Sequence, residues 1–241
     1  ARKKHNKNIP LGSDRVPVPP QEPGARLPPP AAPGQEAKKP AAVTPLRNEG
    51  AIEIIAIGIS TGGPNALRDV FSEIQPGIPQ PIVVVQHMPP GFTAEFALSL
   101  DRICPLSVKE AEDGEALKGA CVYIAPGNSH VVVSRANRGG IINLSDGPPR
   151  NGHRPSADVL FESVAREFQN HALGVIMTGM GGDGARGLAE MRRQGARTLG
   201  QDESSSIVYG MPRVAWELGA VQRQASLTRM AGEISRMAFA S

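Results

Sequence analysis

Residues 52–64 read IEIIAIGISTGGP, and they give the clearest indication of the fold class. Its first part, Ile52–Ile57, is a short apolar run rich in β-branched residues, as in a strand that is buried on both faces. A glycine-rich turn follows, and a helical stretch is expected over about Pro64–Glu73. A buried strand, a tight turn and a helix are the repeating unit of an α/β domain.

The alternation of strand and helix continues to the end of the chain. Pro81–Val85 and Leu173–Thr178 are further continuous apolar runs, which predicts a parallel sheet covered by helices on both faces. The runs 130–134 and 140–144, joined by ANRGG, predict an antiparallel hairpin. Shorter strands are expected at 108–109, 121–125 and 197–200, and helices at 93–100, 156–168, 185–194, 212–218 and 227–239.

The first 50 residues differ in composition from the rest. They hold 11 of the 23 prolines and no aromatic residue, and their nine Lys/Arg against four Asp/Glu give a local charge of +5. The remaining chain has 17 basic and 19 acidic residues, so the overall charge of +3 does not indicate a nucleic-acid-binding face. We predict a disordered, proline-rich basic linker over 1–49 and one folded domain over 50–241.

Nothing in the sequence indicates export or membrane insertion. The N-terminus is polar and basic with no apolar segment behind it, and no stretch approaches the ~20 apolar residues of a membrane-spanning helix. Cys104 and Cys121 lie in or beside apolar runs, where a buried free thiol is the common case. A reducing cytoplasm is therefore the expected location.

Three loops each carry a potentially reactive side chain directly after a buried strand. Ser60 follows the first strand, His87 follows the strand 81–85, and Asp183 follows the strand 173–178. Because sites in open parallel sheets form outside the carboxyl ends of the strands, these side chains are expected to face one crevice. We predict a triad in which Ser60 is the nucleophile, His87 its base and Asp183 the residue that orients His87.

The loop that carries Ser60 matches the pattern Gly-x-Ser-x-Gly between a strand and a helix. The backbone N–H of Thr61 would then face an oxyanion at the start of the helix. The chain order Ser…His…Asp differs from the Ser…Asp…His order of α/β-hydrolases, so the pattern is not interpreted as that fold.

The loop 179–184 supports a competing hypothesis. Its Gly179-x-Gly181-x-x-Gly184 pattern matches the dinucleotide-binding fingerprint, and Asp202 or Glu203 lies near the spacing expected for a ribose-binding acid. A nucleotide-binding oxidoreductase would, however, give Ser60 and His87 no role. The fingerprint also comes late in the chain. The triad is preferred because it uses all three loops.

Five segments spread over about residues 51–241 carry a resemblance to a known family. They read IGISTGGP (57–64), QHMPPGFT (86–93), YIAPGNSH (123–130), GHRPSADVLF (152–161) and TGMGGDG (178–184). In this order they resemble the chemotaxis protein-glutamate methylesterases, the CheB family. The resemblance implies a doubly wound, mostly parallel sheet with a small antiparallel hairpin, and it places the family's catalytic triad on Ser60, His87 and Asp183.

The resemblance also implies an activity. A serine hydrolase of this family demethylates glutamate γ-methyl esters on the cytoplasmic helices of chemotaxis receptors, releases methanol, and commonly deamidates receptor glutamines. The implied oxyanion hole uses the backbone N–H groups of Thr61 and Met180, no metal or organic cofactor is needed, and His153 and Arg154 are expected at the cleft. A receiver domain normally precedes the linker in this family, and the alternative of a non-catalytic receptor-binding module stays open.

Overall fold

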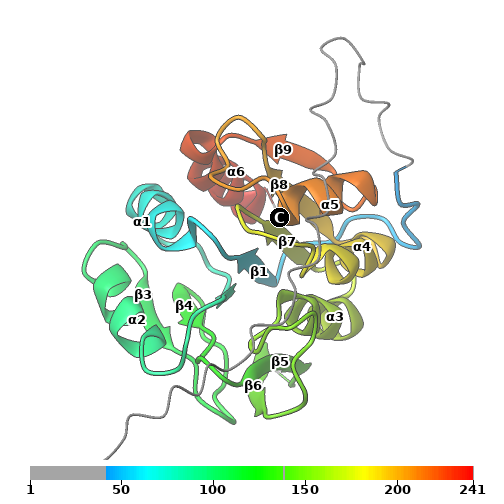
Figure 1. Cartoon of the computed structure of the whole chain (residues 1–241). Helices are drawn as coiled ribbons and strands as arrows, with labels where there is room; N and C mark the ends of the chain where they lie inside the picture. The colour runs from blue at the N-terminus through cyan, green and yellow to red at the C-terminus, as the bar shows by residue number, and fades with distance from the viewer. Residues whose placement is uncertain (1–41, 138, 241) are drawn as a thin grey trace, which may run out of the picture. The chain divides into compact units, whose positions relative to one another are not determined.

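The computed structural model describes residues 42–137 and 139–240 of the chain, and a seven-stranded sheet runs through them (Figure 1). The strand order is β3-β4-β2-β1-β7-β8-β9, and every pairing in this sheet is parallel. The strands are β1 (Ile54–Ile59), β2 (Ile82–Gln86), β3 (Ser107–Glu110), β4 (Cys121–Ile124), β7 (Ala172–Ile176), β8 (Arg197–Gln201) and β9 (Arg223–Ala225).

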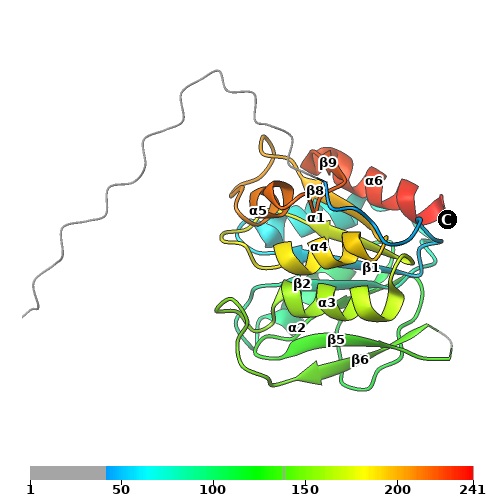
Figure 2. The same ribbon diagram turned by 90° about the vertical axis from the view of Figure 1, so that its right-hand side faces the viewer.

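Helices cover both faces of the sheet, and each face has its own core. Side chains of α1 (Gly63–Glu73), α2 (Thr93–Asp101) and α6 (Leu227–Phe239) pack in the first core. Those of α3 (Ala157–Phe168), α4 (Ala185–Arg193) and α5 (Met211–Glu217) pack in the second, and Figure 2 looks onto these three helices. The strand β1 contributes side chains to both cores because successive side chains of a strand point to opposite faces. Ile55, Ile57 and Ile59 pack in the first core, and Ile54 and Ala56 pack in the second.

The predicted hairpin is confirmed and forms a separate two-stranded sheet. Its strands, β5 (His130–Arg135) and β6 (Gly140–Ser145), are antiparallel. The hairpin lies along α3 (Figure 2), where the Ser163 hydroxyl accepts a hydrogen bond of 3.0 Å from the backbone N–H of Val133. The hairpin thereby extends the second layer, and its side chains Val131, Val133 and Ile142 join the second core.

The predicted fold is correct in class, while the bounds of several elements differ by one or two residues and one strand is additional. The first strand runs on to Ile59, so Ser60 follows it without a gap. The strand β9 was not expected, because its three residues are Arg, Gln and Ala and show no apolar run. It pairs with β8 at the edge of the sheet, where a strand needs less apolar surface than one in the middle.

The path of the chain explains where a site forms. From β1 the chain moves outward through β2 to the edge strand β3 and turns back to β4, and it later crosses to β7 on the other side of β1. The gap between the loops that leave β1 and β7 is therefore the topological switch point, where open parallel sheets bind their ligands.

Part of the predicted linker is described by the structure, and the remainder, 1–41, lies outside the described residues. Residues 42–49 run along the domain: the N–H of Leu46 donates to the Arg193 carbonyl at 2.8 Å, and Glu49 lies 3.1 Å from the guanidinium of Arg197. None of the helices in the described residues is long and apolar enough to cross a membrane.

Candidate active site

Ser60 is held in a tight turn at the end of β1. Its N–H donates to the Thr178 carbonyl at 3.0 Å, and its own carbonyl accepts from the N–H of Gly63 at 2.8 Å. Gly62 in this turn has φ +83°, a conformation in which glycine carries no steric penalty. The side chain of Ile207 also packs where a Cβ of residue 62 would sit. Residue 62 is therefore best glycine for two reasons, its backbone conformation and the lack of space for a side chain. The turn places the Ser60 hydroxyl at the topological switch point.

His87 connects Ser60 to Asp183. Its Nδ1 lies 3.0 Å from the Ser60 hydroxyl and its Nε2 lies 2.8 Å from Oδ2 of Asp183. Since an ionised carboxylate only accepts hydrogen bonds, Nε2 carries the proton and Nδ1 is free to accept from Ser60. In the well-known serine proteases Nε2 faces the serine and Nδ1 the aspartate, so the two ring nitrogens have exchanged roles here.

Asp183 is almost completely buried, with 1% of its side chain exposed, and donors surround it. Besides His87, it accepts hydrogen bonds from the Asn151 amide (2.9 Å), the Ser156 hydroxyl (2.6 Å) and the N–H of Ala157 (2.7 Å). Burial by itself raises the pKa of this carboxyl. The hydrogen bonds outweigh that effect and hold the pKa well below its usual range. Asp183 is therefore ionised at neutral pH.

The N-terminus of α3 is aimed at the same carboxylate. The first two helical N–H groups, those of Ala157 and Asp158, point to Asp183 at 2.7 and 3.3 Å. A negative charge there is stabilised by the helix dipole. The close approach depends on glycines below the helix, because a Cβ on Gly58 or Gly184 would lie within 3.0 Å of the Ala157 side chain.

Gln86 connects the loop that carries Ser60 to the loop that carries His87. Its side-chain amide donates to the carbonyl of Ser60 and to the carbonyl of His87, both at 3.1 Å. The side chain is buried, and its carbonyl oxygen lies where a Cβ of Gly63 would be. Gln86 therefore holds the two loops at a constant separation.

His153 and Arg154 take different places. The His153 ring stacks on the His87 ring, with ring centroids 3.8 Å apart and an angle of 11° between the ring planes. The Arg154 guanidinium instead donates to the Asn128 side chain (2.7 Å) and the Asp146 carbonyl (2.8 Å). His153 thus lies against the triad, while Arg154 holds neighbouring loops together.

The two backbone groups expected to form the oxyanion hole belong to segments next to Ser60. Thr61 is the next residue, and the 179–180 loop is adjacent, since a Cβ on Gly179 would lie 2.9 Å from the Ser60 Cβ. Within the described residues, the N–H groups of Thr61 and Met180 donate to no backbone or side-chain acceptor. Both donors are therefore available to a ligand oxygen.

The competing use of the 179–184 loop finds no support in its surroundings. Asp183 is turned to His87, and the Asp202 carboxylate accepts from the hydroxyls of Ser204 and Ser205 at 3.1 and 2.7 Å. These contacts close the turn after β8 and hold the Asp202 carboxylate within that turn.

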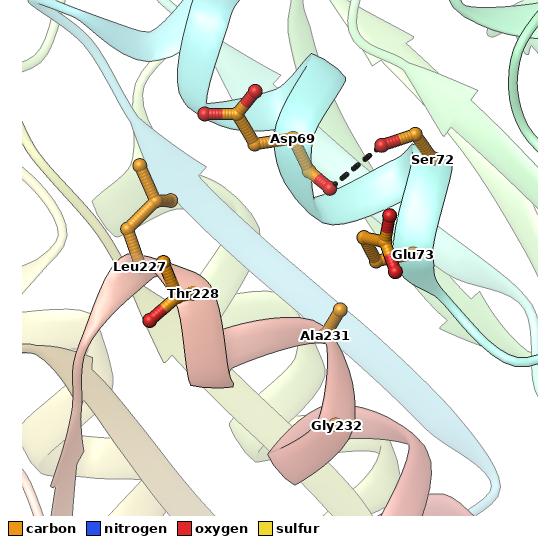
Figure 3. Close-up of a pocket in the computed structure, with 7 residues that line it drawn as sticks. All are labelled: Asp69, Ser72, Glu73, Leu227, Thr228, Ala231 and Gly232. Atoms are coloured by element: carbon orange, nitrogen blue, oxygen red, sulfur yellow. Dashed lines mark hydrogen bonds between the residues drawn. The ribbon is translucent and has the colours of Figure 1, made fainter.

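A groove elsewhere is unrelated to these residues. It lies between α1 and α6, has a volume of about 560 Å³, and is bordered by acidic and small side chains (Figure 3). Its lining includes Asp69, Ser72, Glu73 and Gly232, and none of the three predicted triad residues.

Within the described residues, no group of three His, Cys, Asp or Glu side chains could hold a metal ion.

Three contributors to the site were not predicted: Gln86, Asn151 and Ser156. Gln86 and Ser156 lie inside segments that carry the family resemblance, and Asn151 comes one residue before another such segment. Their place in or beside these segments could have indicated a role. Each of them, however, bonds Ser60 or Asp183 from 26 to 32 residues away in the sequence. No spacing rule connects such residues.

A parallel α/β domain in which a serine, a histidine and an aspartate meet at the switch point has the architecture of a serine hydrolase. Comparison with known proteins identifies the kind. Residues 55–234 match the family model described as CheB methylesterase, and the chain belongs to this family. The fold agrees, since the crystal structure of the Thermotoga maritima CheB methylesterase catalytic domain matches with a TM-score of 0.75 and 36% identity. That match covers 78% of this chain and all of the other.

Curated relatives carry the name protein-glutamate methylesterase/protein-glutamine glutaminase. The protein of that name from Treponema denticola is 61% identical over 206 residues, which is 86% of this chain and 55% of the relative. The one from Treponema pallidum is 57% identical over 194 residues, or 80% and 48%. The chain thus spans about half the length of the curated relatives it matches.

Proposed function

We propose that this domain hydrolyses glutamate γ-methyl esters on the cytoplasmic helices of methyl-accepting chemotaxis receptors, and that it also deamidates receptor glutamines. The observation that carries the proposal is the unbroken chain of hydrogen bonds from Ser60 through His87 to the ionised Asp183. Such a chain activates a serine hydroxyl for attack on an ester or amide carbonyl. The substrate class comes from family membership and from the names of the relatives.

The proposed reaction begins at the Ser60 hydroxyl. His87 Nδ1 takes its proton while Oγ attacks the ester carbonyl carbon, and the N–H groups of Thr61 and Met180 stabilise the oxyanion. When the tetrahedral intermediate collapses, methanol leaves with the proton returned by His87, and the receptor glutamate stays bonded to Ser60. Water, deprotonated by His87, then releases the carboxylate and restores the hydroxyl. With a glutamine substrate ammonia leaves in place of methanol.

Asp183 makes the proton transfer favourable. While His87 is neutral, the Nε2–H bond to Asp183 selects the tautomer whose Nδ1 can accept a proton. Once Nδ1 is protonated, the carboxylate stabilises the imidazolium charge. Because the pKa of Asp183 is lowered by its hydrogen bonds, the carboxylate keeps its charge throughout this step.

The proposal places the domain in the cytoplasm, where the receptor helices that carry the methyl esters lie. Both cysteines are free thiols in the structure. A receiver domain in the full-length chain is the proposed regulatory partner, as the resemblance implies.

The test is methanol release from methylated receptor membranes. The domain should release methanol, and Ser60→Ala should lower the rate at least about 10³-fold with its circular dichroism unchanged. Ser72→Ala is the matched control, since within the described residues the Ser72 hydroxyl bonds only its own helix, at the Asp69 carbonyl (Figure 3). It should keep the rate of the unmodified domain. Receptor binding without methanol release would instead support a non-catalytic module.

A further inference from the structure

A second histidine lies flat against the His87 ring. The His153 and His87 rings are nearly parallel, with an interplanar angle of 11° and centroids 3.8 Å apart. The steps proposed above use both nitrogens of His87 and give His153 no part. A ring in van der Waals contact with a catalytic base still affects that base, because it restricts its rotation and shares its electrostatic environment.

The position of His153 is determined by a tight turn. Arg150 and His153 exchange two backbone hydrogen bonds, of 3.0 and 2.9 Å. The same turn contains Asn151, whose side chain bonds Asp183 at 2.9 Å. The ring that covers His87 is thus carried on a segment that is itself anchored to the third member of the triad.

The contact matters because the His87 ring must keep one particular orientation. Its ring plane must contain two directions at once, one toward the Ser60 hydroxyl and one toward the Asp183 carboxylate. The terminal torsion of a histidine has a broad energy minimum, so the two hydrogen bonds alone leave the ring free to tilt. A flat ring stacked on its face opposes that tilt.

The charge of His153 must also be considered. When His87 takes the Ser60 proton it becomes an imidazolium, which a neutral aromatic ring tolerates and a second imidazolium at 3.8 Å repels. Burial lowers the pKa of His153, the neighbouring His87 lowers it further, and Asp183 acts in the opposite direction. His153 is thus neutral at neutral pH.

The other charged side chains of its segment are turned to partners of their own. Arg150 pairs with Glu162 at 2.6 Å, Arg154 donates to Asn128 at 2.7 Å, and Asp158 accepts from Asn151 and from the N–H of Gly187 at 2.7 Å each. Within the described residues, the titratable groups that act on the His153 ring are His87, which stacks on it, and Asp183.

We propose that His153 is a positioning residue of the esterase: as a neutral ring it keeps His87 aligned between Ser60 and Asp183, and its protonation switches the site off. This inference rests on the proposed function, since it assigns His87 the role of base. It predicts that the loss of activity at acid pH involves two protons rather than one.

The experiment compares the unmodified domain with His153→Ala and His153→Phe. The rate at which a fluorophosphonate labels Ser60 is measured from pH 8 downward, because this reaction needs the base but no receptor. At pH 8, His153→Ala should label about 10- to 100-fold more slowly, the cost of a misaligned catalytic group. His153→Phe restores a flat ring and should recover most of that loss. His171→Phe, remote from the triad, is the control for exchanging a histidine and should label like the unmodified domain.

The pH profiles test the second half of the proposal. For the unmodified domain, the logarithm of the labelling rate should steepen at acid pH from a slope of about one to about two, whereas His153→Phe should keep a slope of about one. The unmodified profile alone checks this point if a variant folds poorly, and near-ultraviolet circular dichroism reports folding at each pH.

The outcomes separate this inference from the proposed function. Equal labelling rates and superimposable profiles for all four proteins would overturn the role of His153, whether or not methanol is released from receptors. Equal impairment of both His153 variants with the unmodified slope would overturn it too. A normal His153 effect on labelling with no methanol release would contradict the proposed substrate alone.

Discussion

Two regions of the molecule meet at the candidate active site, and they contribute different groups. The loops that leave β1, β2 and β7 supply the three groups that would react, Ser60, His87 and Asp183. The segment 150–158, between β6 and α3, supplies support: two side-chain donors and two helical N–H groups for Asp183, and a ring for the face of His87. The three candidate reactive groups thus come from strand ends, while a separate segment stabilises the charge of Asp183 and packs against the ring of His87.

The different contributions of the two regions can be tested at Asp183, where the regions meet. Asp183→Asn should lower the rate of methanol release by about 10⁴-fold, because an amide cannot hold the required His87 tautomer. It should also destabilise the domain, since the N–H groups at the start of α3 lose a negative charge. Single-turnover methanol release and thermal unfolding measure the two effects. More than a tenth of the normal rate would show that Asp183 is not needed for orientation.

A change in the strand-end region should affect both catalysis and stability. Gln86→Leu leaves the carbonyls of Ser60 and His87 without their buried donor and should cost about 1–3 kcal/mol of stability. The methanol release rate should fall by about 10- to 100-fold as the two loops separate. Urea unfolding and initial rates are the measurements.

The chain offers a matched control for that change. Gln80 is also buried, and its amide also donates to two carbonyls, those of Ile52 and Ala238, which are remote from the triad. Gln80→Leu should lose comparable stability and keep its rate. If both variants lose activity in proportion to stability, Gln86 has no specific role in positioning.

A change in the supporting segment should be milder. Ser156→Ala removes one donor from Asp183, but His87, Asn151 and Ala157 still donate to the carboxylate. We expect about a tenfold lower rate and a loss of about 1–2 kcal/mol in urea unfolding, as for a hydrogen bond to a charged group. A loss of activity as large as that of Asp183→Asn would mean that the segment does more than support the carboxylate.

The smallest expected effect is on the pH dependence of stability. The folded pKa of Asp183 is lowered, so between that pKa and the unfolded value of about 3.9 the unfolded chain binds more protons. The stabilisation from Asp183 is therefore present above about pH 4 and is lost as pH falls through the folded pKa. Urea midpoints from pH 6 to pH 3 should fall less steeply for Asp183→Asn. Parallel curves would contradict the assigned shift.

The sequence predicted Ser60, His87 and Asp183 of the strand-end region. Of the supporting segment, it predicted only His153 and Arg154 at the cleft, and it did not indicate Asn151 or Ser156. Ser60, His87 and Asp183 each follow a continuous apolar run, and such runs are recognisable because strands buried on both faces have no polar alternation. The segment 150–158 has no such pattern, and its residues acquire their role only when α3 packs close to Gly58 and Gly184. The local amino-acid composition does not predict that contact.

The sequence by itself determined the α/β class, the hairpin, and which three loops meet, because hydrophobic patterning and the direction of parallel strands suffice for these. Only the tertiary structure decided which nitrogen of His87 faces Ser60, that Asp183 lies at the N-terminus of α3, and that His153 covers the His87 ring. The physical reason is that patterning places a residue on an element, whereas hydrogen bonds and ring stacking depend on ångström-scale distances between elements far apart in the chain.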